Sequence, residues 1–381
     1  MQLGQYRRIM GRTLQNLFSW KTTRNLLVIE SDDWGGIRMP SFEAYNKLNT
    51  QFPEVITDRY ENYDSLECND DIEVLFESLI RYKDSNGNHP VLTANFIMGN
   101  PNFDEIKKHQ FLKFTFEPFY NTYVKYPKRD NVLKMINEGI NEKIFKPQLH
   151  GRDHVNVQSW LTSLREGDKI TRAAFDEGLI SFGKIPASKS RMRCMDALKY
   201  SSSSERKYII DSLAEGARLF KDVWGYRSSS FIAPSYVWST DLESMLYQEG
   251  ILFLQGLFVQ YEPLTDEGAE FHKKYHYTGQ RNQHGQLFIT RNAMFEPSSG
   301  RSNDPVSSCL KEISNAFAWG APAIICSHRV NYIGSINGEN RSRNIKLLNL
   351  LLKAVLTKWP KTEFITTDDL GMIIKSSQAR Y

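Results

Sequence analysis

Short apolar runs alternate with longer segments of helical periodicity over most of this sequence, and this alternation limits the fold more than any other feature. The runs with the length and composition of strands are Asn25–Ser31, Val91–Asn95, Phe145–Leu149, Ser229–Ala233, Ile251–Gln255, Gln286–Thr290, Ala323–Ser327 and Thr362–Thr366. Several are apolar throughout, which indicates strands that are covered on both faces. Between them, Leu310–Trp319 and Arg343–Trp359 have apolar positions three and four residues apart, which predicts helices.

Strands that alternate with helices predict an α/β fold with a parallel sheet, either open or closed into a barrel. A chain of 381 residues is long enough for several domains, but (β/α) barrels often form a single domain that is longer than the average domain. We therefore expect a single domain over residues 1–381. The mostly helical stretch 155–226 is interpreted as an elaborated crossover, in which Ser201–Ser204 cap a helix that starts near Glu205.

Charge and cysteine content exclude several classes of protein. The net charge is +4, and Lys and Arg are scattered, so neither a nucleic-acid surface nor a membrane-binding patch is indicated. The cysteines are far apart, which argues against a disulfide framework or a cysteine zinc site: Cys68, Cys194, Cys309 and Cys326. Residues 1–8 lack the pattern of a signal peptide, and no apolar run reaches the length of a membrane span. A cytoplasmic enzyme is therefore expected.

Reactive side chains follow the predicted strands, at the point where each strand ends. These segments are Asp32–Gly36, His150–His154, Pro234–Tyr236 and His328–Arg329. Because the carboxyl ends of parallel strands point to one face of the sheet, segments that are distant in sequence are expected to meet there.

His150 and His154 are spaced so that both rings can reach one cation if the segment is helical. A nearby carboxylate would complete a site of two histidines and one acid, with positions left for water and substrate. A metal in such a site lowers the pKa of bound water and polarises a carbonyl oxygen. The alternative is that each ring simply bonds backbone groups or water.

Asp32 and Asp33 have two interpretations. One acid after a strand often caps the next helix, and Gly35–Gly36 fit a turn there. Capping needs only one acid, however, and two adjacent carboxylates can divide the roles of metal ligand and general base. His328 is likewise either a partly buried structural histidine or a group for proton transfer at the end of its strand.

At these residues the chain resembles the polysaccharide deacetylases of carbohydrate esterase family four. The resemblance runs from about Asn25 to Ile374, and it implies an irregular (β/α) barrel of seven or eight mostly parallel strands. It implies that Asp32 is the general base, that Asp33, His150 and His154 bind the metal, and that His328 is the general acid. The metal implied is divalent, with zinc the default and cobalt, nickel or manganese as alternatives.

The sequence departs from this family at two motifs. Where the third motif has an Arg, this chain has Ile232, and Ser235 separates Pro234 from Tyr236. The N–H that binds the oxyanion is therefore assigned to either Ser235 or Tyr236. The fourth motif, an Asp near a Trp, has no clear match, and the nearest polar residues are Asn292 and Glu296.

The substrate is expected to be a carbohydrate, and a cytoplasmic location suggests a glycan precursor rather than a finished polymer. Aromatic faces pack well against sugar rings, although the same residues are equally suited to a core. The aromatic residues beside the catalytic segments are Trp34, Tyr236, Trp238 and Tyr332.

Two other functions fit parts of the pattern. A glycoside hydrolase would need two carboxylates that are separated by about 5 to 10 Å. Asp32 and Asp33 are neighbours, so the second carboxylate would have to come from a distant residue such as Glu296. A non-catalytic glycan-binding protein would keep the fold without turnover. Neither would require metal for its function.

Overall fold

The computed structural model describes residues 11–56, 58–183, 194–264 and 271–378. The predicted absence of a signal peptide concerns residues 1–8, which lie outside the described residues. Residues 184–193, within the predicted helical elaboration, also lie outside them. The division into a single domain stays a prediction.

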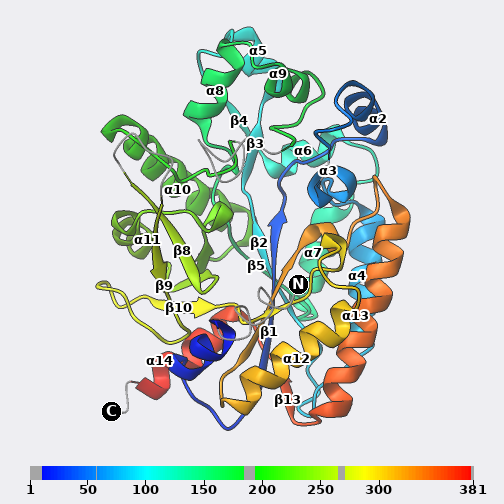
Figure 1. The fold of residues 1–381 in the computed structure, drawn as a ribbon, viewed down its shortest axis with the longest axis vertical. Helices are drawn as coiled ribbons and strands as arrows, with labels where there is room; N and C mark the ends of the chain where they lie inside the picture. Colours follow the sequence, from blue (N-terminus) through cyan, green and yellow to red (C-terminus); the bar gives the residue numbers. More distant parts are fainter. Residues whose placement is uncertain (1–10, 57, 184–193, 265–270, 379–381) are drawn as a thin grey trace.

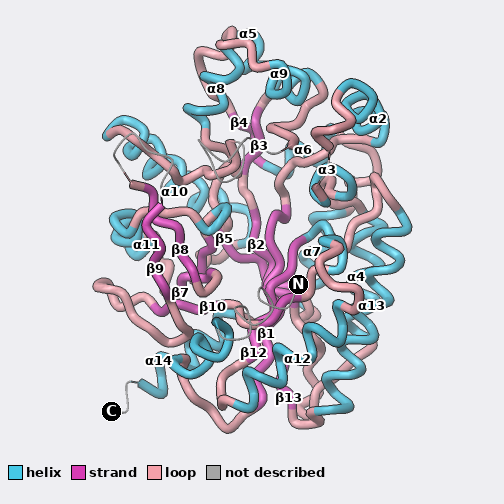
Figure 2. The backbone as a smooth tube through the Cα atoms, viewed as in Figure 1, coloured by secondary structure: helices cyan, strands magenta, loops and turns pink. Residues whose placement is uncertain are grey.

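A parallel sheet of nine strands forms the centre of the molecule (Figures 1 and 2). Its order is β10-β7-β6-β5-β2-β1-β12-β11, and β13 pairs with β1 beside this path. The strands are β1 (Asn25–Trp34), β2 (Leu92–Phe96), β5 (Phe145–Leu149), β6 (Ser230–Ile232), β7 (Phe253–Gly256), β10 (Leu287–Thr290), β11 (Ala293–Met294), β12 (Ala323–His328) and β13 (Thr362–Phe364).

All pairings within this sheet are parallel. The end strands β10 and β11 are separated in the chain by Arg291 and Asn292, so the two ends of the sheet lie close together, as in a barrel. This confirms the predicted α/β class with mostly parallel strands. Each of the predicted strand segments contains a strand of this sheet.

Two antiparallel hairpins and one short strand were not predicted. β3 (Gly99–Pro101) pairs with β4 (Phe116–Pro118), and β8 (Val259–Pro263) pairs with β9 (Phe271–Tyr275). These strands are short or strongly polar, as in the exposed sequence Phe-His-Lys-Lys-Tyr of β9. The two-residue β11 is too short to give an apolar run.

Helices cover the sheet on both sides. In Figure 1, α4, α12 and α13 lie along one side and α10 and α11 along the other, while α5, α8 and α9 join β3 and β4 at one end. The α-helices are α2 (Phe42–Gln51), α3 (Arg59–Tyr63), α4 (Asn69–Ile80), α5 (Phe103–Lys108), α6 (Phe119–Lys125), α7 (Val132–Asn141), α8 (Val157–Arg165), α9 (Lys169–Asp176), α10 (Ser203–Trp224), α11 (Glu243–Gln248), α12 (Pro305–Ala318), α13 (Gly338–Lys358) and α14 (Thr367–Gln378). Short 3₁₀ turns are η1 (Pro234–Tyr236), η2 (Thr240–Leu242), η3 (Pro297–Ser299) and η4 (Arg329–Asn331).

The predicted helices are present as α12 and α13. In the predicted helical elaboration, Ser202 caps α10 by accepting a hydrogen bond from the N–H of Glu205, as Ser201–Ser204 suggested. Trp160 of α8 is fully buried and packs with Phe103 and Phe175 in an apolar cluster at this end of the molecule. Among the helices of the described residues, none has the length and apolar character needed to cross a bilayer.

Candidate metal centre and its surroundings

An irregular backbone at the end of β1 points the carboxylates of Asp32 and Asp33 in different directions. The pairing of β1 with β2 shifts register between Ser31 and Trp34, and Asp33 has a left-handed backbone with φ of 75°. Gly35 follows with φ of 73°, and a Cβ there would lie 2.8 Å from the carbonyl oxygen of Ile97, so the turn requires glycine. Neither acid caps a helix, since Ser41 caps α2. The irregular backbone therefore aims Asp32 and Asp33 at different partners.

Asp33, His150 and His154 meet at the carboxyl ends of β1 and β5. One ligand atom from each of them lies within 4.8 Å of the other two. Oδ1 of Asp33 is 3.6 Å from Nε2 of His150 and 3.5 Å from Nε2 of His154. The sequence analysis assumed that a helix would bring the two histidines to one side, but the segment that carries them is not helical. An irregular loop after β5 brings both rings to one side instead.

The protonation of these groups fits a cation. Nδ1–H of His150 donates to the carbonyl oxygen of Ile232 at 2.8 Å, which leaves the lone pair of Nε2 facing Asp33. Burial, together with the charge of Arg38, lowers the pKa of His154 to about 3, so this ring is neutral. Its Nδ1 has no hydrogen-bond partner among the described residues. Two imidazoles and one carboxylate suit zinc or a similar divalent ion.

Arg38 adds a cation at the edge of this centre. One of its amino groups lies 3.1 Å from Oδ1 of Asp33, and its Nε lies 3.5 Å from Asp64. Burial alone would raise the pKa of Asp33, but the charge of Arg38 holds it well below its usual range. The Asp33 carboxylate is therefore ionised and available to a cation.

Asp32 is held by an arginine from the other end of the sheet. The two amino groups of Arg291 donate to the two oxygens of Asp32 at 2.6 and 2.7 Å, and Asn95 donates to Oδ1 at 2.8 Å. The Nε of Arg291 bonds Glu30, and the guanidinium is fully buried. Burial would raise the pKa of Asp32, but the charge and hydrogen bonds of Arg291 lower it to about 2. Asp32 is thus an ionised acceptor at neutral pH.

His328 lies between two carboxylates. It is the register partner of Asp32, and its Nε2 is 3.6 Å from Oδ2 of that residue. Its Nδ1 forms a short hydrogen bond with Glu296, which Arg59 and Asn331 also contact. Burial alone would lower the pKa of His328, but the charge and hydrogen bond of Glu296 raise it. The charge of Glu296 therefore favours the protonated form of this histidine.

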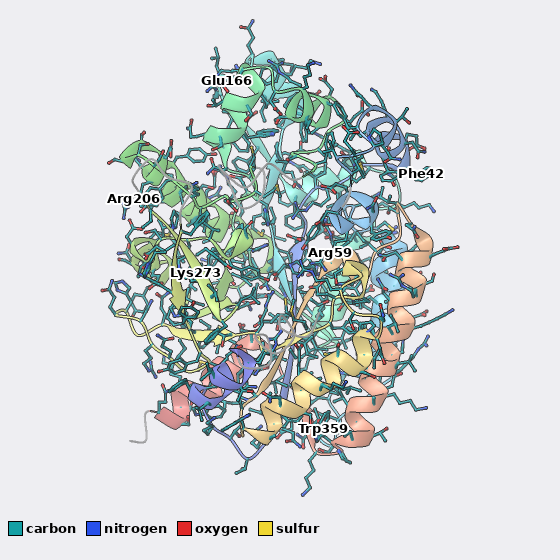
Figure 3. The ribbon with its side chains drawn as sticks, viewed as in Figure 1. Phe42, Arg59, Glu166, Arg206, Lys273 and Trp359 are labelled. Carbon is teal, nitrogen blue, oxygen red and sulfur yellow. The ribbon has the colours of Figure 1, made fainter. Side chains whose placement is uncertain are left out.

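Arg59 lies near the middle of the molecule, whereas Phe42, Glu166 and Arg206 lie at its periphery (Figure 3). Its guanidinium pairs with Glu296 and stacks 4.8 Å from the ring centre of Tyr60. The ring of Tyr60 is in turn 5.9 Å from that of His328. Arg59 and Tyr60 thus border the His328 side of the site.

The segment after β6 lies beside Asp32. The hydroxyl of Tyr236 is 3.2 Å from Arg291, while the hydroxyl of Ser235 donates to the carbonyl oxygen of Met195. The N–H of Tyr236 already bonds the carbonyl oxygen of Ala233 at 3.0 Å. Of the two N–H groups predicted to bind an oxyanion, that of Tyr236 is therefore disfavoured.

Three predicted sugar-binding aromatics belong to the core, and this corrects the sequence interpretation. Trp34 is 1% exposed, packs against Phe145 and donates to Ser31. Trp238 is 4% exposed and donates to Glu243, and Tyr332 is fully buried against Ser327. These three rings are therefore buried in the core, where no ring face is open to a sugar.

Sequence reasoning missed Arg291, Arg38 and Arg59. Arg291 directly follows a predicted strand, which is the same signal that identified the other site residues. The third motif of the family, however, places its arginine just before Pro234. Glu296 was named as a candidate and lies on His328, whereas Asn292 bonds Asn16, Pro322 and Ile324 away from the site. Arg38 and Arg59 lie in loops and helix starts without a sequence pattern.

A second group of potential ligands lies close by. Glu296, Cys326 and His328 have one atom each within 4.8 Å of the others. Two arginines already satisfy this group: Arg59 bonds Glu296, and Arg291 lies 3.4 Å from Sγ of Cys326. Burial raises the pKa of Cys326 to about 11, so its sulfur is a thiol rather than a thiolate ligand. The Asp33 group is the better cation site.

No protein-family model matches the chain, and no curated protein matches its sequence. Among solved structures, the 4-α-glucanotransferase from Thermococcus litoralis gives a TM-score of 0.46 at 9% identity over 91% of this chain, which covers 40% of that chain. Proteins described as polysaccharide deacetylases from Mycobacterium smegmatis and Pseudomonas aeruginosa PAO1 give TM-scores of 0.44 and 0.45, at 11% and 9% identity. They match 94% and 92% of this chain over 93% and 91% of their own.

Proposed function

We propose that this protein is a hydrolase that removes an acetyl group from a carbohydrate with a divalent metal, zinc by default, held by Asp33, His150 and His154. The convergence of these three ligand atoms within 4.8 Å carries the proposal. The carbohydrate substrate is supported by the resemblance of Ser31–Asp33, His150–His154 and His328 to the motifs of polysaccharide deacetylases. A glycan precursor is the form of substrate that we propose.

When bound, such a metal would acidify a water and polarise the acetyl carbonyl. Asp32 lies beside the ligand Asp33 and is ionised, so it would accept a hydrogen bond from the attacking water and take its proton. Arg291 positions this carboxylate with two hydrogen bonds, and Glu30 holds Arg291 from behind. A bidentate pair of this kind fixes orientation as well as charge.

His328 would then donate a proton to the leaving nitrogen or oxygen. Its position opposite Asp32 and its raised pKa suit a general acid. The charge of Glu296 raises the pKa of the ring, and the charge of Arg59 lowers that of Glu296. Two carboxylates with different neighbours thus take different roles: Asp32 accepts a proton, and Glu296 supports the group that gives one.

The rival glycoside hydrolase would use Asp32 and Glu296 as its pair of acids. That chemistry needs one of the two carboxyl groups to be protonated, with a raised pKa. Here the neighbouring arginines outweigh burial and lower the pKa of both Asp32 and Glu296 to about 2. The electrostatics therefore favour the deacetylase over the glycosidase.

The test compares metal content and acetate release in wild type and His150→Ala, after dialysis against zinc. We expect about one zinc per chain in the wild type and a loss of at least roughly tenfold in zinc affinity in the variant, as for removal of one ligand. Acetate release from acetylated oligosaccharides should fall with the zinc content. His272→Ala, which changes an exposed histidine of β9, is the matched control and should retain both.

Equal zinc content in the wild type and in His150→Ala would overturn the metal assignment. Cleavage of glycosidic bonds that resists chelation would favour the hydrolase of whole sugars. Sugar binding with no acetate release under zinc, cobalt, nickel or manganese would support the non-catalytic glycan-binding protein.

A further inference from the structure

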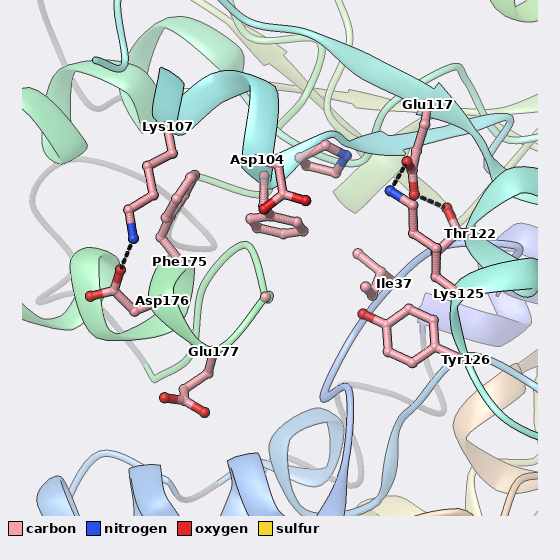
Figure 4. A pocket seen from close by; sticks show the side chains of 13 residues that line it. Ile37, Asp104, Lys107, Glu117, Thr122, Lys125, Tyr126, Phe175, Asp176 and Glu177 are labelled. Atoms are coloured by element: carbon pink, nitrogen blue, oxygen red, sulfur yellow. Dashed lines mark hydrogen bonds and ion pairs between the residues drawn. The ribbon is translucent and has the colours of Figure 1, made fainter. Parts of the chain in front are cut away.

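A cavity of about 350 Å³ lies between β4 and α6 on one side and α5 and the end of α9 on the other (Figure 4). Its volume is within the range of sites for small ligands. None of the residues that line it belongs to the metal centre or to the His328 cluster. Ile37 closes the side of the cavity that faces the loop after β1.

The lining carries an excess of negative charge. It contains the carboxylates of Asp104, Glu117, Asp176 and Glu177 and the ammonium groups of Lys107 and Lys125. Lys107 lies 3.7 Å from Asp176, and Lys125 pairs with Glu117; Figure 4 shows the two pairs on opposite sides of the cavity.

Asp104 is an acid of the lining that pairs with neither Lys107 nor Lys125. Glu177 is occupied by Lys47 from outside the cavity. The exposed side chain of Asp104 makes no hydrogen bond or ion pair within the part of the chain that the structure describes, and Lys108, whose charge acts on it from the same helix, pairs with Glu105. In Figure 4 the Asp104 carboxylate lies between the two lysine–acid pairs. The cavity therefore offers a carboxylate to a cation and disfavours an anion.

Two half-buried rings supply the rest of the recognition surface. Phe103 lines the cavity and packs edge to face at 5.2 Å on the buried Phe175, and Tyr126 lies on the opposite wall beside Lys125. Rings together with a few polar groups are the usual composition of a sugar site, because the C–H face of a sugar packs on the ring while its hydroxyls bond the polar groups. A carboxylate among them selects a sugar with an ammonium group.

Hydrogen bonds join this cavity to the turn that follows Asp33. Thr122 donates to Glu117 on the cavity wall, and Asn100 bonds both Thr122 and the carbonyl oxygen of Gly35. Asn100 also accepts from the N–H of Ile37. Ile37 is only four residues beyond Asp33, so their Cα atoms are at most about 14 Å apart. A short oligosaccharide can span such a distance.

We propose that the cavity binds a cationic amino-sugar unit of the same glycan whose acetylated unit lies at the metal centre. This inference rests on the proposed function, since removal of an N-acetyl group leaves an amine that is protonated at neutral pH. A chain that already carries a free amine would thus be held by Asp104 while a further unit is processed. Glycans with carboxylate or phosphate groups would be bound less well.

The experiment measures binding by calorimetry, with no need for turnover. The probes are a β-1,4-linked glucosamine tetramer, which is cationic, and the neutral N-acetylglucosamine tetramer. Wild type should bind the cationic tetramer more tightly, and Asp104→Asn should weaken that binding roughly threefold or more, as expected for one exposed ion pair. Asp70→Asn, another exposed acid in the first turn of a helix, is the control and should bind as the wild type does.

Equal affinity for the two tetramers, no binding of either, or an unchanged affinity in Asp104→Asn would overturn the proposal. The same titration on His150→Ala separates the two inferences. Preference for the cationic tetramer without acetate release from any variant would contradict the proposed function and leave the cavity assignment standing. Acetate release by the wild type with no effect of Asp104→Asn on binding would contradict the cavity assignment alone.

Discussion

Arg291 is fully buried between Glu30 and Asp32, and it determines how the end of β1 is charged. A guanidinium without water around it depends on its acids for stabilisation, and the acids depend on it in turn. The same reciprocal arrangement is found at Glu296, which Arg59 and His328 both contact. At this scale the site consists of two acid–arginine pairs, with His328 between them.

Replacement of Glu296 tests the role of His328. In Glu296→Gln the ring loses a negative neighbour, so the pKa of His328 should fall. Because a raised pKa keeps the imidazole protonated to higher pH, the alkaline limb of acetate release should move to lower pH, with a loss of roughly tenfold or more at neutral pH. The measurement is an NMR titration of the His328 ring in metal-free protein, together with the pH–rate profile.

Glu138→Gln, on an exposed position of α7, is the matched control and should change neither the titration nor the profile. An unaltered His328 titration in Glu296→Gln would show that the carboxylate does not set the protonation of this ring. Loss of activity without a shift of the alkaline limb would indicate a purely structural role for Glu296.

Among the elements, α10 sets the position of the loop that carries the two histidines. A Cβ built at Gly216 would lie 2.9 Å from the backbone nitrogen of Arg152 and 3.1 Å from its Cα. Arg152 also bonds Asp153, Glu215 and Tyr208, so the loop is tied to the helix. Glycine at residue 216 therefore allows the close approach of helix and loop.

We expect Gly216→Ala to weaken zinc binding roughly tenfold, because α10 must move away and shift the loop between His150 and His154. The change should be seen in competition with a chromophoric chelator. Gly338→Ala is the matched control, since nothing lies within 4 Å of the added Cβ in α13. It should bind zinc normally and be slightly stabilised, as alanine favours the helix. Unchanged zinc affinity in Gly216→Ala would mean that the loop adapts to the helix.

The strands show which parts of the fold could be predicted from the sequence. Apolar runs predicted each parallel strand of the sheet except β11, because a strand buried on both faces has few alternatives to apolar residues. They did not predict β3 and β4, which have three residues each, or β8 and β9, whose sequences are largely polar. The order of strands β1, β5 and β12 in the sheet depends on pairing between segments that are distant in sequence. No local sequence pattern shows which of these segments pair.

The same holds for the site. Asp32, Asp33, His150, His154 and His328 were found because each ends or follows an apolar strand. The left-handed backbone of Asp33 and the non-helical loop of the histidines depend on contacts that only the folded chain provides. Trp34 was misjudged because adjacency in sequence to a catalytic residue does not determine which way a side chain points.

For the whole molecule, buried neutral histidines make stability depend on pH. Burial lowers the pKa of His276 to about 4 from its ordinary value of 6.5, and the ring stacks on Phe288 at 3.8 Å. The unfolded chain takes up a proton below pH 6.5 that the folded chain excludes until about pH 4. Stability is therefore lost as the pH falls through this window.

We expect His276→Gln to reduce the slope of unfolding free energy against pH by about 1.4 kcal/mol per pH unit within that window, the value for one proton. Urea unfolding of metal-free protein between pH 7 and pH 4 measures it, since release of metal then contributes nothing. His272→Gln changes an exposed histidine of β9 and should keep the wild-type slope. A slope that is unaltered in His276→Gln would show that other groups dominate acid unfolding.

The pairing of β1 with β12, in which Leu27 lies opposite Ala323, has a consequence for the order of events during synthesis. A ribosome adds roughly 5 to 20 residues per second, so β1 waits on the order of 15 to 60 seconds for this neighbour. The three proposed metal ligands are all made within the first half of the chain, whereas Arg291, Glu296 and His328 come late. In a growing chain the groups proposed to bind the ion thus precede the groups proposed to use it, and the apolar edge of β1 stays uncovered until the last third emerges.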